Sequence, residues 1–321
     1  MRVLVTGMGG EIGTRVAQLL EEHDDVAEIA GCDYAPPRRR LRRSEFTRID
    51  ARDRDRLVAF VTDFAPHAVA HLGIYEPASR LSPREAARAT EACTVHALGA
   101  AARAGALERI VVRSGLSAYG RGRGRALMPD EDAPLAPNNH WGRLLLEVES
   151  LAAGIGRRHN VTVSAMRYAT IAGSHVPSPL GRVLRLPTVP VPALADPPFS
   201  LLDRDDAARA MVEALLRGHD GPLNIVGPGA TSPWQAVCFG GRLPMPVDGL
   251  GWRLARRLTE FLGAPMPDHV VDVLRKGLTG DGSRAYDELG LGFVRPTQEV
   301  LADLYAWATV TPIVEATRRV A

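Results

Sequence analysis

Lysine is almost absent from this chain. Lys276 is the only one, and arginine supplies all the other basic residues. We attribute this bias to a GC-rich genome rather than to function. Cysteine is also scarce, and Cys32, Cys93 and Cys238 stand far apart with no CxxC pair and no His/Cys cluster. The spacing argues against a metal site and indicates a reducing compartment.

The sequence has no apolar run of membrane-spanning length, and its first expected strand begins at residue 2, which leaves no room for a signal peptide. We therefore expect a cytoplasmic protein. A net charge of +2 gives no case for binding nucleic acid or an acidic membrane. With 321 residues and 45% hydrophobic content, one large α/β unit with an appended part is expected, acting on a small-molecule substrate.

The first thirteen residues predict a strand, a glycine turn and a helix. Residues 2–5 are a short apolar run, and residues 11–20 carry apolar side chains at helical spacing. The glycines between them are three apart, which suits a tight turn, bare backbone beside a pyrophosphate, and close helix–strand packing. The free N–H groups of the helix start favour phosphate. The expected cofactor residues of this turn are Gly7, Met8, Gly9, Gly10, Glu11, Ile12 and Gly13.

Asp33 ends the second expected strand, 20 residues beyond Gly13. A carboxylate there accepts hydrogen bonds from an adenosine ribose and repels a 2′-phosphate, which favours NAD over NADP. The arginine run at 38–43 leaves an alternative open, because it could bind a 2′-phosphate or be a solvated loop. Four further cofactor contacts are expected at strand ends, with Asp50 able instead to cap the next helix: Asp50, Ala51, Leu72 and Gly73.

Strands alternate with helices through the first half of the chain. Strands are expected at 26–32, 46–49, 68–73, 109–113 and 161–166, and helices at 56–64, 84–104 and 140–155. This order predicts an α/β fold, a Rossmann-like doubly wound parallel sheet. We place the dinucleotide-binding domain at 1–166. A smaller, irregular, proline-rich substrate lobe follows at 167–321, interleaved with the first domain, with helices at 205–216, 250–262 and 297–308 and a strand at 223–226.

The chain resembles the extended short-chain dehydrogenase/reductase superfamily, of the NAD-dependent epimerase/dehydratase type. The resemblance runs from Val3 to about Leu304. It rests on several segments taken in order: T-G-M-G-G-E-I-G (6–13), I-D-A-R-D (49–53), H-L-G (71–73), S-G-L-S-A-Y-G (114–120), D-E-D-A-P-L-A-P (130–137), W-G-R-L-L-L-E-V-E (141–149), R-Y-A-T-I-A-G (167–173), D-D-A-A-R-A (205–210) and S-R-A-Y-D-E-L-G (283–290).

The resemblance implies a serine, a tyrosine and a lysine, the last two four residues apart on a helix. The tyrosine exchanges a proton while the nicotinamide exchanges a hydride, and the lysine lowers the tyrosine's pKa. Here the three positions are Gly115, Trp141 and Leu145, and no tyrosine has a lysine four residues later. As substitute catalytic groups we name Ser114, Ser117 and Tyr119, and more remotely His71, Tyr75, Tyr168 and His175.

Three functions remain open. The chain could be an enzyme of epimerase/dehydratase type with a non-standard proton donor. It could be a redox-silent dinucleotide-binding sensor, scaffold or partner subunit, or a non-redox cyclase or isomerase. The helix at 140–155 adds an apolar stripe that packs either against the sheet or against a second subunit in a homodimer. The stripe comprises Trp141, Leu144, Leu145, Val148, Leu151, Ala152 and Ile155.

Overall fold

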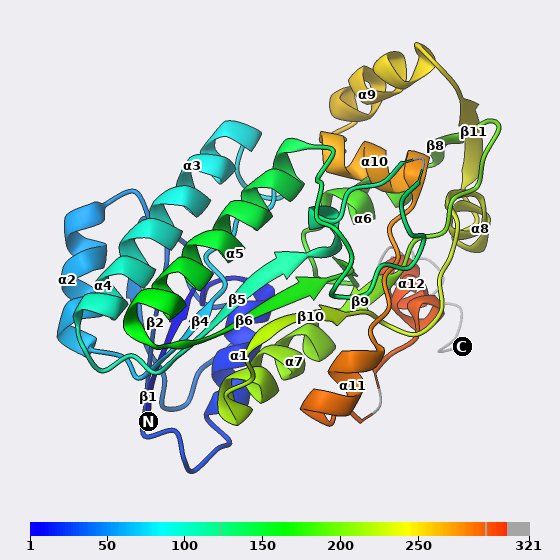
Figure 1. The fold of residues 1–321 in the computed structure, drawn as a ribbon. Coiled ribbons are helices and arrows are strands. Elements are labelled where there is room, and N and C mark those ends of the chain that lie inside the picture. Colours follow the sequence, from blue (N-terminus) through cyan, green and yellow to red (C-terminus); the bar gives the residue numbers. More distant parts are fainter. Residues whose placement is uncertain (123, 293, 307–321) are drawn as a thin grey trace, which may run out of the picture.

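A seven-stranded parallel sheet forms the centre of the molecule (Figure 1), with the strand order β10-β6-β5-β4-β1-β2-β3. The structure is a computed structural model that describes residues 1–122, 124–292 and 294–306. The predicted doubly wound, Rossmann-like fold is confirmed. The strands are β1 (Arg2–Thr6), β2 (Glu28–Asp33), β3 (Glu45–Arg48), β4 (Ala68–His71), β5 (Arg109–Gly115), β6 (Thr162–Tyr168) and β10 (Gly221–Ile225).

Helices cover both faces of this sheet, because successive side chains of a strand point to opposite faces. Val3 and Val5 of β1 belong to one core, and Leu4 belongs to the other. The core of Val3 and Val5 is covered by α1 (Glu11–Leu20) and α7 (Arg204–Arg217). The core of Leu4 is covered by α2 (Arg54–Phe64), α3 (Pro83–Cys93), α4 (Gly99–Arg103) and α5 (His140–His159).

Two expected elements differ from the structure. The helix expected to run unbroken over 84–104 contains a π-helical turn, η1 (Thr94–Leu98), between α3 and α4. The strand expected over 68–73 ends at His71, and Leu72 and Gly73 leave the sheet as a loop. For the helix expected at 297–308, the described part is α12 (Thr297–Ala306), and residues 307 and 308 lie outside the described residues.

The second half of the chain divides between the sheet and a smaller lobe. Strand β10 extends the sheet beside β6, and α7 packs on α1. The smaller lobe extends beyond the carboxyl ends of the strands (Figure 1). The remaining elements are η2 (Leu116–Ala118), β7 (Thr170–Ala172), α6 (Pro179–Leu184), β8 (Thr188–Pro192), β9 (Leu201–Asp203), α8 (Pro233–Phe239), β11 (Leu243–Val247), α9 (Gly251–Phe261), α10 (Asp268–Lys276) and α11 (Ser283–Leu289).

The apolar stripe of α5 is buried within the chain. Trp141, Leu144 and Leu145 belong to the core between the sheet and the helices. The stripe therefore packs against the sheet, which is one of the two arrangements expected from the sequence. None of the helices in the described ranges is both long and apolar enough to span a bilayer.

Candidate active site

The glycine turn between β1 and α1 has the geometry that its residues require. Gly7 has a φ of +69°, and a Cβ there would lie 2.4 Å from the carbonyl oxygen of Leu72. A Cβ on Gly13 would lie 2.1 Å from the oxygen of Gly7. At Gly10 the Cβ would meet only that same oxygen, at 3.3 Å, and Gly10 lines a cavity. Two of the glycines therefore allow close packing, and the third keeps backbone bare toward the cavity.

Three other residues expected around the cofactor are packed inside the protein. The side chain of Met8 is fully buried against β2. A Cβ on Gly9 would lie 1.9 Å from the oxygen of Ala35, and one on Gly73 would lie 2.3 Å from the sulfur of Cys93. These residues pack against the backbone and side chains behind the cavity wall, at the turn and at the end of β4.

Two of the further cofactor contacts expected at strand ends, Asp50 and Ala51, lie outside the lining of this cavity. The carboxylate of Asp50 forms an ion pair of 2.6 Å with Arg52, and Ala51 is buried. Asp53 rather than Asp50 caps α2, since its side chain accepts a hydrogen bond from the backbone N–H of Arg56.

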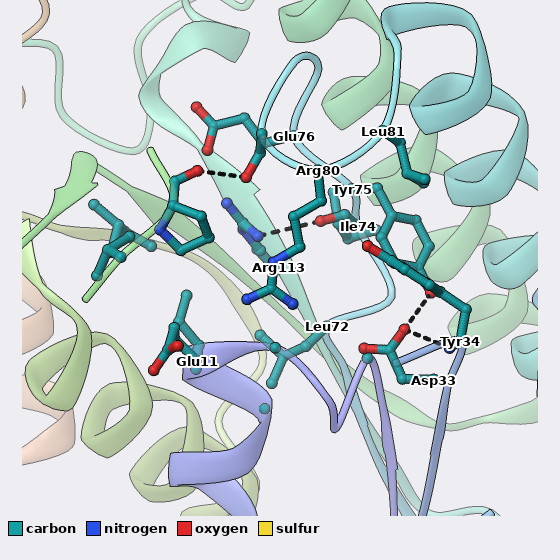
Figure 2. A pocket seen from close by; sticks show the side chains of 18 residues that line it. Glu11, Asp33, Tyr34, Leu72, Ile74, Tyr75, Glu76, Arg80, Leu81 and Arg113 are labelled. Carbon is teal, nitrogen blue, oxygen red and sulfur yellow. Dashed lines mark hydrogen bonds between the residues drawn. The ribbon is translucent and has the colours of Figure 1, made fainter. Parts of the chain in front are cut away.

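Asp33 lies at the wall of the cavity beside the N-terminus of α1, which also contributes Glu11 and Ile12 (Figure 2). Its Oδ1 accepts hydrogen bonds from the backbone N–H of Tyr34, at 2.7 Å, and from the hydroxyl of Tyr75, at 3.2 Å. Burial raises the pKa of Asp33 to about 6, against the lowering effect of these hydrogen bonds. The carboxyl group therefore changes charge close to neutral pH.

A loop over residues 75–82 covers the cavity and contributes Arg80. Within the loop the backbone N–H of Ala78 donates to the oxygen of Leu81, and Ala78 has a φ of +60°. The hydroxyl of Ser79 donates to the oxygen of Pro177 at 2.5 Å, which ties the loop to the segment after β7. Figure 2 shows the side chain of Arg80 reaching from this loop into the cavity. A cation is thereby held over the start of α1.

The arginine run at 38–43 stabilises the far end of α1. The guanidinium of Arg43 donates to the carbonyl oxygens of Leu20, Glu21 and His23, which lie at or just after the helix C-terminus. Arg38 lies 3.8 Å from Glu11. Among the described residues, the cavity lining includes no member of the run.

A second, inner cavity adjoins the first at Glu76 and Arg113, which line both. Its wall contains Gly115 at the end of β5 and Trp141 and Leu145 of α5. A Cβ on Gly115 would lie 3.2 Å from a methyl carbon of Leu145, so these positions touch. The three positions that the resemblance assigns to serine, tyrosine and lysine thus share one surface, without an ionisable group among them.

Two ionisable residues face this apolar wall. The Nε2 of His269, on α10, lies 3.1 Å from the Oε1 of Glu76, in the loop after β4. The imidazole also packs against the indole of Trp141, with ring centroids 5.8 Å apart. Histidine is the side chain that most readily exchanges protons near neutral pH, and a carboxylate partner orients its ring. This pair can therefore exchange a proton with a ligand in the inner cavity.

Arg113 lies at the junction of the two cavities. Its Nη1 donates to the oxygen of Ile74 at 3.1 Å (Figure 2), and burial lowers the pKa of its guanidinium. The charge of Glu76 opposes the effect of burial on the pKa of the Arg113 guanidinium, and the charge of Arg80 acts to lower the pKa of Asp33. Because both guanidinium groups line the outer cavity, they favour an anionic ligand there.

The family described as NAD dependent epimerase/dehydratase matches residues 3–226. This chain belongs to that family. The match covers the parallel sheet and all the residues that line the outer cavity, and it stops after β10, before His269.

Several other proteins are similar to this chain in sequence. Uncharacterized proteins of Mycobacterium tuberculosis and Mycobacterium bovis are 27% identical over 331 residues, with 98% of this chain and 86% of each relative covered. A UDP-glucose 4-epimerase of Azospirillum brasilense is 29% identical over 185 residues, which are 56% of this chain and 51% of that protein.

Solved structures of family members share the fold. The UDP-glucuronic acid 4-epimerase of Bacillus cereus, in complex with UDP-glucuronic acid and NAD, superimposes with a TM-score of 0.73 at 19% identity, covering 96% of this chain and 98% of that one. The UDP-glucose 4-epimerase of Brucella ovis, in complex with NAD, gives 0.71 at 21% identity, covering 95% and 97%. These neighbours are crystallised with NAD bound, and at such identities the likeness shows the fold.

Within this epimerase/dehydratase fold, two of the expected substitute groups are hydrogen-bonded into a buried network. The hydroxyl of Ser114 donates to Glu149, which pairs with Arg167 at 2.8 Å. The hydroxyl of Tyr119 donates to the side chain of Asn224 at 2.8 Å and accepts from Arg167 at the same distance. Ser114 and Ser117 both line the inner cavity. The structure therefore brings both serines to the cavity, with the Ser114 hydroxyl bound to Glu149, and leaves Tyr119 outside its lining.

The more remote substitutes have structural partners. His71 lies between the hydroxyls of Thr6 and Thr94, at 2.8 and 3.0 Å, and burial lowers its pKa to about 3. Tyr168 lines the inner cavity, and its hydroxyl donates to the oxygen of Ala207. Tyr75 donates to Asp33.

Sequence reasoning missed Glu76, Arg80, Arg113 and His269. Glu76 and Arg80 follow the expected fourth strand within a few residues, so the rule that ligands bind at strand ends could have found them. Arg113 ends an expected strand and could have been found in the same way. His269 is 193 residues from Glu76 in the chain, and no local pattern connects them.

Proposed function

We propose that this chain binds NAD in the outer cavity and carries out an epimerase- or dehydratase-type reaction on a nucleotide-linked sugar, with His269 as its proton-exchanging group. The hydrogen bond between His269 and Glu76, set against Trp141 on the wall where the family's tyrosine is expected, is the observation that carries this proposal. The substrate class is taken from the relatives, which are UDP-sugar enzymes by name.

The outer cavity fits a dinucleotide. Gly10 leaves backbone bare at the start of α1, whose free N–H groups and helix dipole favour a pyrophosphate. Arg80 adds a cation above the same helix start. Asp33 would hold the ribose hydroxyls, and its charge disfavours the 2′-phosphate of NADP. When bound, NAD supplies a hydride acceptor.

The chain's own residues would transfer the proton. His269 would accept a proton from the substrate hydroxyl at its imidazole and return it later in the reaction. Glu76 orients the imidazole through the 3.1 Å contact between its Oε1 and Nε2. Trp141 and Leu145 exclude water from one side of the cavity. Ser117, which lines the same cavity, would hydrogen-bond the substrate oxygen.

The test starts from NAD-loaded protein mixed with UDP-glucose and UDP-glucuronic acid, with nicotinamide absorbance and product stereochemistry as readouts. His269→Gln should lower turnover at least about a hundredfold, the usual scale for general acid–base catalysis. Its NAD affinity, measured by calorimetry, should not change. His140→Gln is the matched control, because His140 is exposed at the start of α5. Full turnover by His269→Gln would show that the proton carrier is another group.

A second candidate is a redox-silent NAD-binding protein. It is favoured by the engagement of Ser114 and Tyr119 in the buried network and by the apolar wall. NAD binding with no turnover in the wild type would support this candidate over the first. Absence of NAD binding would contradict both.

Compartment and assembly are also part of the proposal. Cys32 and Cys93 are buried free thiols and Cys238 is an exposed one, which suits a reducing cytoplasm. A homodimer through α5 would have to use the helix's polar face, because its apolar stripe is buried in the chain. Light scattering of Glu147→Arg, on that polar face, tests such a dimer.

A further inference from the structure

Helix α9 is firmly attached to the smaller lobe by one face only. Trp252, Ala255 and Thr259 are buried on that face, and Arg275 of α10 lies over the ring of Trp252 at 5.6 Å. An ion pair of 2.8 Å joins Arg256 to Asp268. Figure 1 shows α9 at the outer end of the lobe, away from the sheet. The opposite face of the helix is therefore presented outward in a defined orientation.

That outward face is a ridge of large apolar side chains. Leu254 is 70% exposed and Phe261 is 87% exposed. Single exposed apolar side chains are normal on a protein surface, but a contiguous group of them indicates an interaction site. The spacing of four, four and three residues puts the members on one side of a helix. We call this set the α9 ridge: Leu250, Leu254, Leu258, Phe261 and Leu262.

A further exposed leucine follows strand β8. The backbone N–H of Ala193 donates to the oxygen of Val247, three residues before Leu250, and the next residue, Leu194, is 89% exposed.

Positive charge borders the ridge. Helix α9 contains three arginines and one glutamate. With about 100° of rotation per residue, Arg253 and Arg257 lie directly beside the edge formed by Leu250 and Leu254. Both arginines are exposed. Apolar side chains on one side and exposed arginines along its edge are the pattern of a helix that lies in the plane of a membrane interface.

We propose that α9 docks the protein on an anionic phospholipid surface, with the α9 ridge inserted among the lipids and Arg253 and Arg257 at the headgroups. The charge of these arginines complements anionic headgroups. A protein partner is less well suited, because the face of one eleven-residue helix is small beside the roughly 1,200 Å² of a standard stable interface. A bilayer sets no such minimum.

This proposal differs from the expectation of no membrane contact in the sequence analysis. That expectation rested on the net charge of the whole chain and on the absence of a spanning run. Neither quantity detects a short surface helix, whose ridge and charges are local. The proposal is also independent of the proposed catalytic chemistry, since no member of the ridge lines either cavity.

Vesicle co-sedimentation of the full-length protein tests it. The probe is vesicles of equal parts phosphatidylcholine and phosphatidylglycerol, compared with phosphatidylcholine alone. The wild type should sediment with the anionic vesicles and much less with the neutral ones, and added salt should weaken binding. Leu254→Asn should lower the partition coefficient about tenfold. The matched control is Leu243→Asn on β11, a leucine of equal exposure (68%) outside the ridge, which should bind like the wild type.

Each contrary result has a definite meaning. A wild type that stays in the supernatant overturns the proposal. If both leucine variants lose binding equally, or if Leu254→Asn binds fully, the α9 ridge is not the membrane-binding surface. If Arg257→Gln binds anionic vesicles as well as the wild type does, the electrostatic part is wrong. If Leu254→Asn instead converts a dimer into a monomer without vesicles, the ridge is an interface between two copies of this chain.

Discussion

At the scale of single residues, Asp33 connects NAD binding to pH. Its pKa in the free protein is raised by burial to about 6. In the proposed complex the ribose hydroxyls donate to the ionised carboxylate, so bound NAD should favour the deprotonated form. Linkage then makes the NAD affinity constant above about pH 6 and lowers it by up to about tenfold for each pH unit below that value. Calorimetry between about pH 5 and pH 8 measures this dependence.

Asp33→Asn supplies the control, because an amide keeps the shape and cannot ionise. Its NAD affinity should be lower than that of the wild type and flat across the same pH range. If the NAD affinity of the wild type does not change with pH, or if the variant shows the same pH dependence, Asp33 does not bind the ribose.

At the scale of elements, the structure bears on the arginine run at 38–43, which the sequence left open as a 2′-phosphate site or a solvated loop. Arg43 donates to backbone oxygens at the end of α1, where the carbonyl groups lack helical partners. Arg43→Ala should therefore lower the free energy of unfolding by about 1–2 kcal/mol, the scale of charge-assisted hydrogen bonds near a surface. Urea denaturation measures the loss, and the exposed Arg39→Ala should change stability by less than about 0.5 kcal/mol.

A helix cap and a 2′-phosphate site also differ in the cofactor preference that they predict. As a helix cap, Arg43 can be replaced without changing the ratio of NAD to NADP affinity. An unchanged stability together with weakened NADP binding would instead make the run a 2′-phosphate site.

The same elements show what local sequence could predict. The strand, turn and helix over residues 2–20 were predicted because each depends on near neighbours, such as the apolar run of the strand and the glycines of the turn. The positions of Gly115, Trp141 and Leu145 on one wall followed from the resemblance. The pairing of His269 with Glu76 could not be predicted, because it depends on how α10 of the smaller lobe lies against the loop after β4. Contacts of that range are set by the packing of the whole fold.

At the scale of the whole molecule, the two halves of the chain complete one sheet. β10 hydrogen-bonds along β6 from Gly221 to Ile225, and α7 covers the face that carries Val3 and Val5. The predicted boundary at residue 166 therefore falls inside β6, and it separates most of that strand from β10 and α1 from its covering helix. The sequence of β10 alone, a short apolar run between glycine and proline, does not reveal which sheet it joins.

A chain that ends at residue 166 should consequently fail to fold by itself. It would leave the edge of β6 without a partner, which invites association with other chains, and it would expose the apolar surface that Met211 and Leu215 of α7 cover. We expect it to show no cooperative urea transition by near-ultraviolet circular dichroism, whereas the full chain shows one under the same conditions. A cooperative transition in the short chain would mean that the first 166 residues form an independent domain, with β10 and α7 added to a core already stable without them.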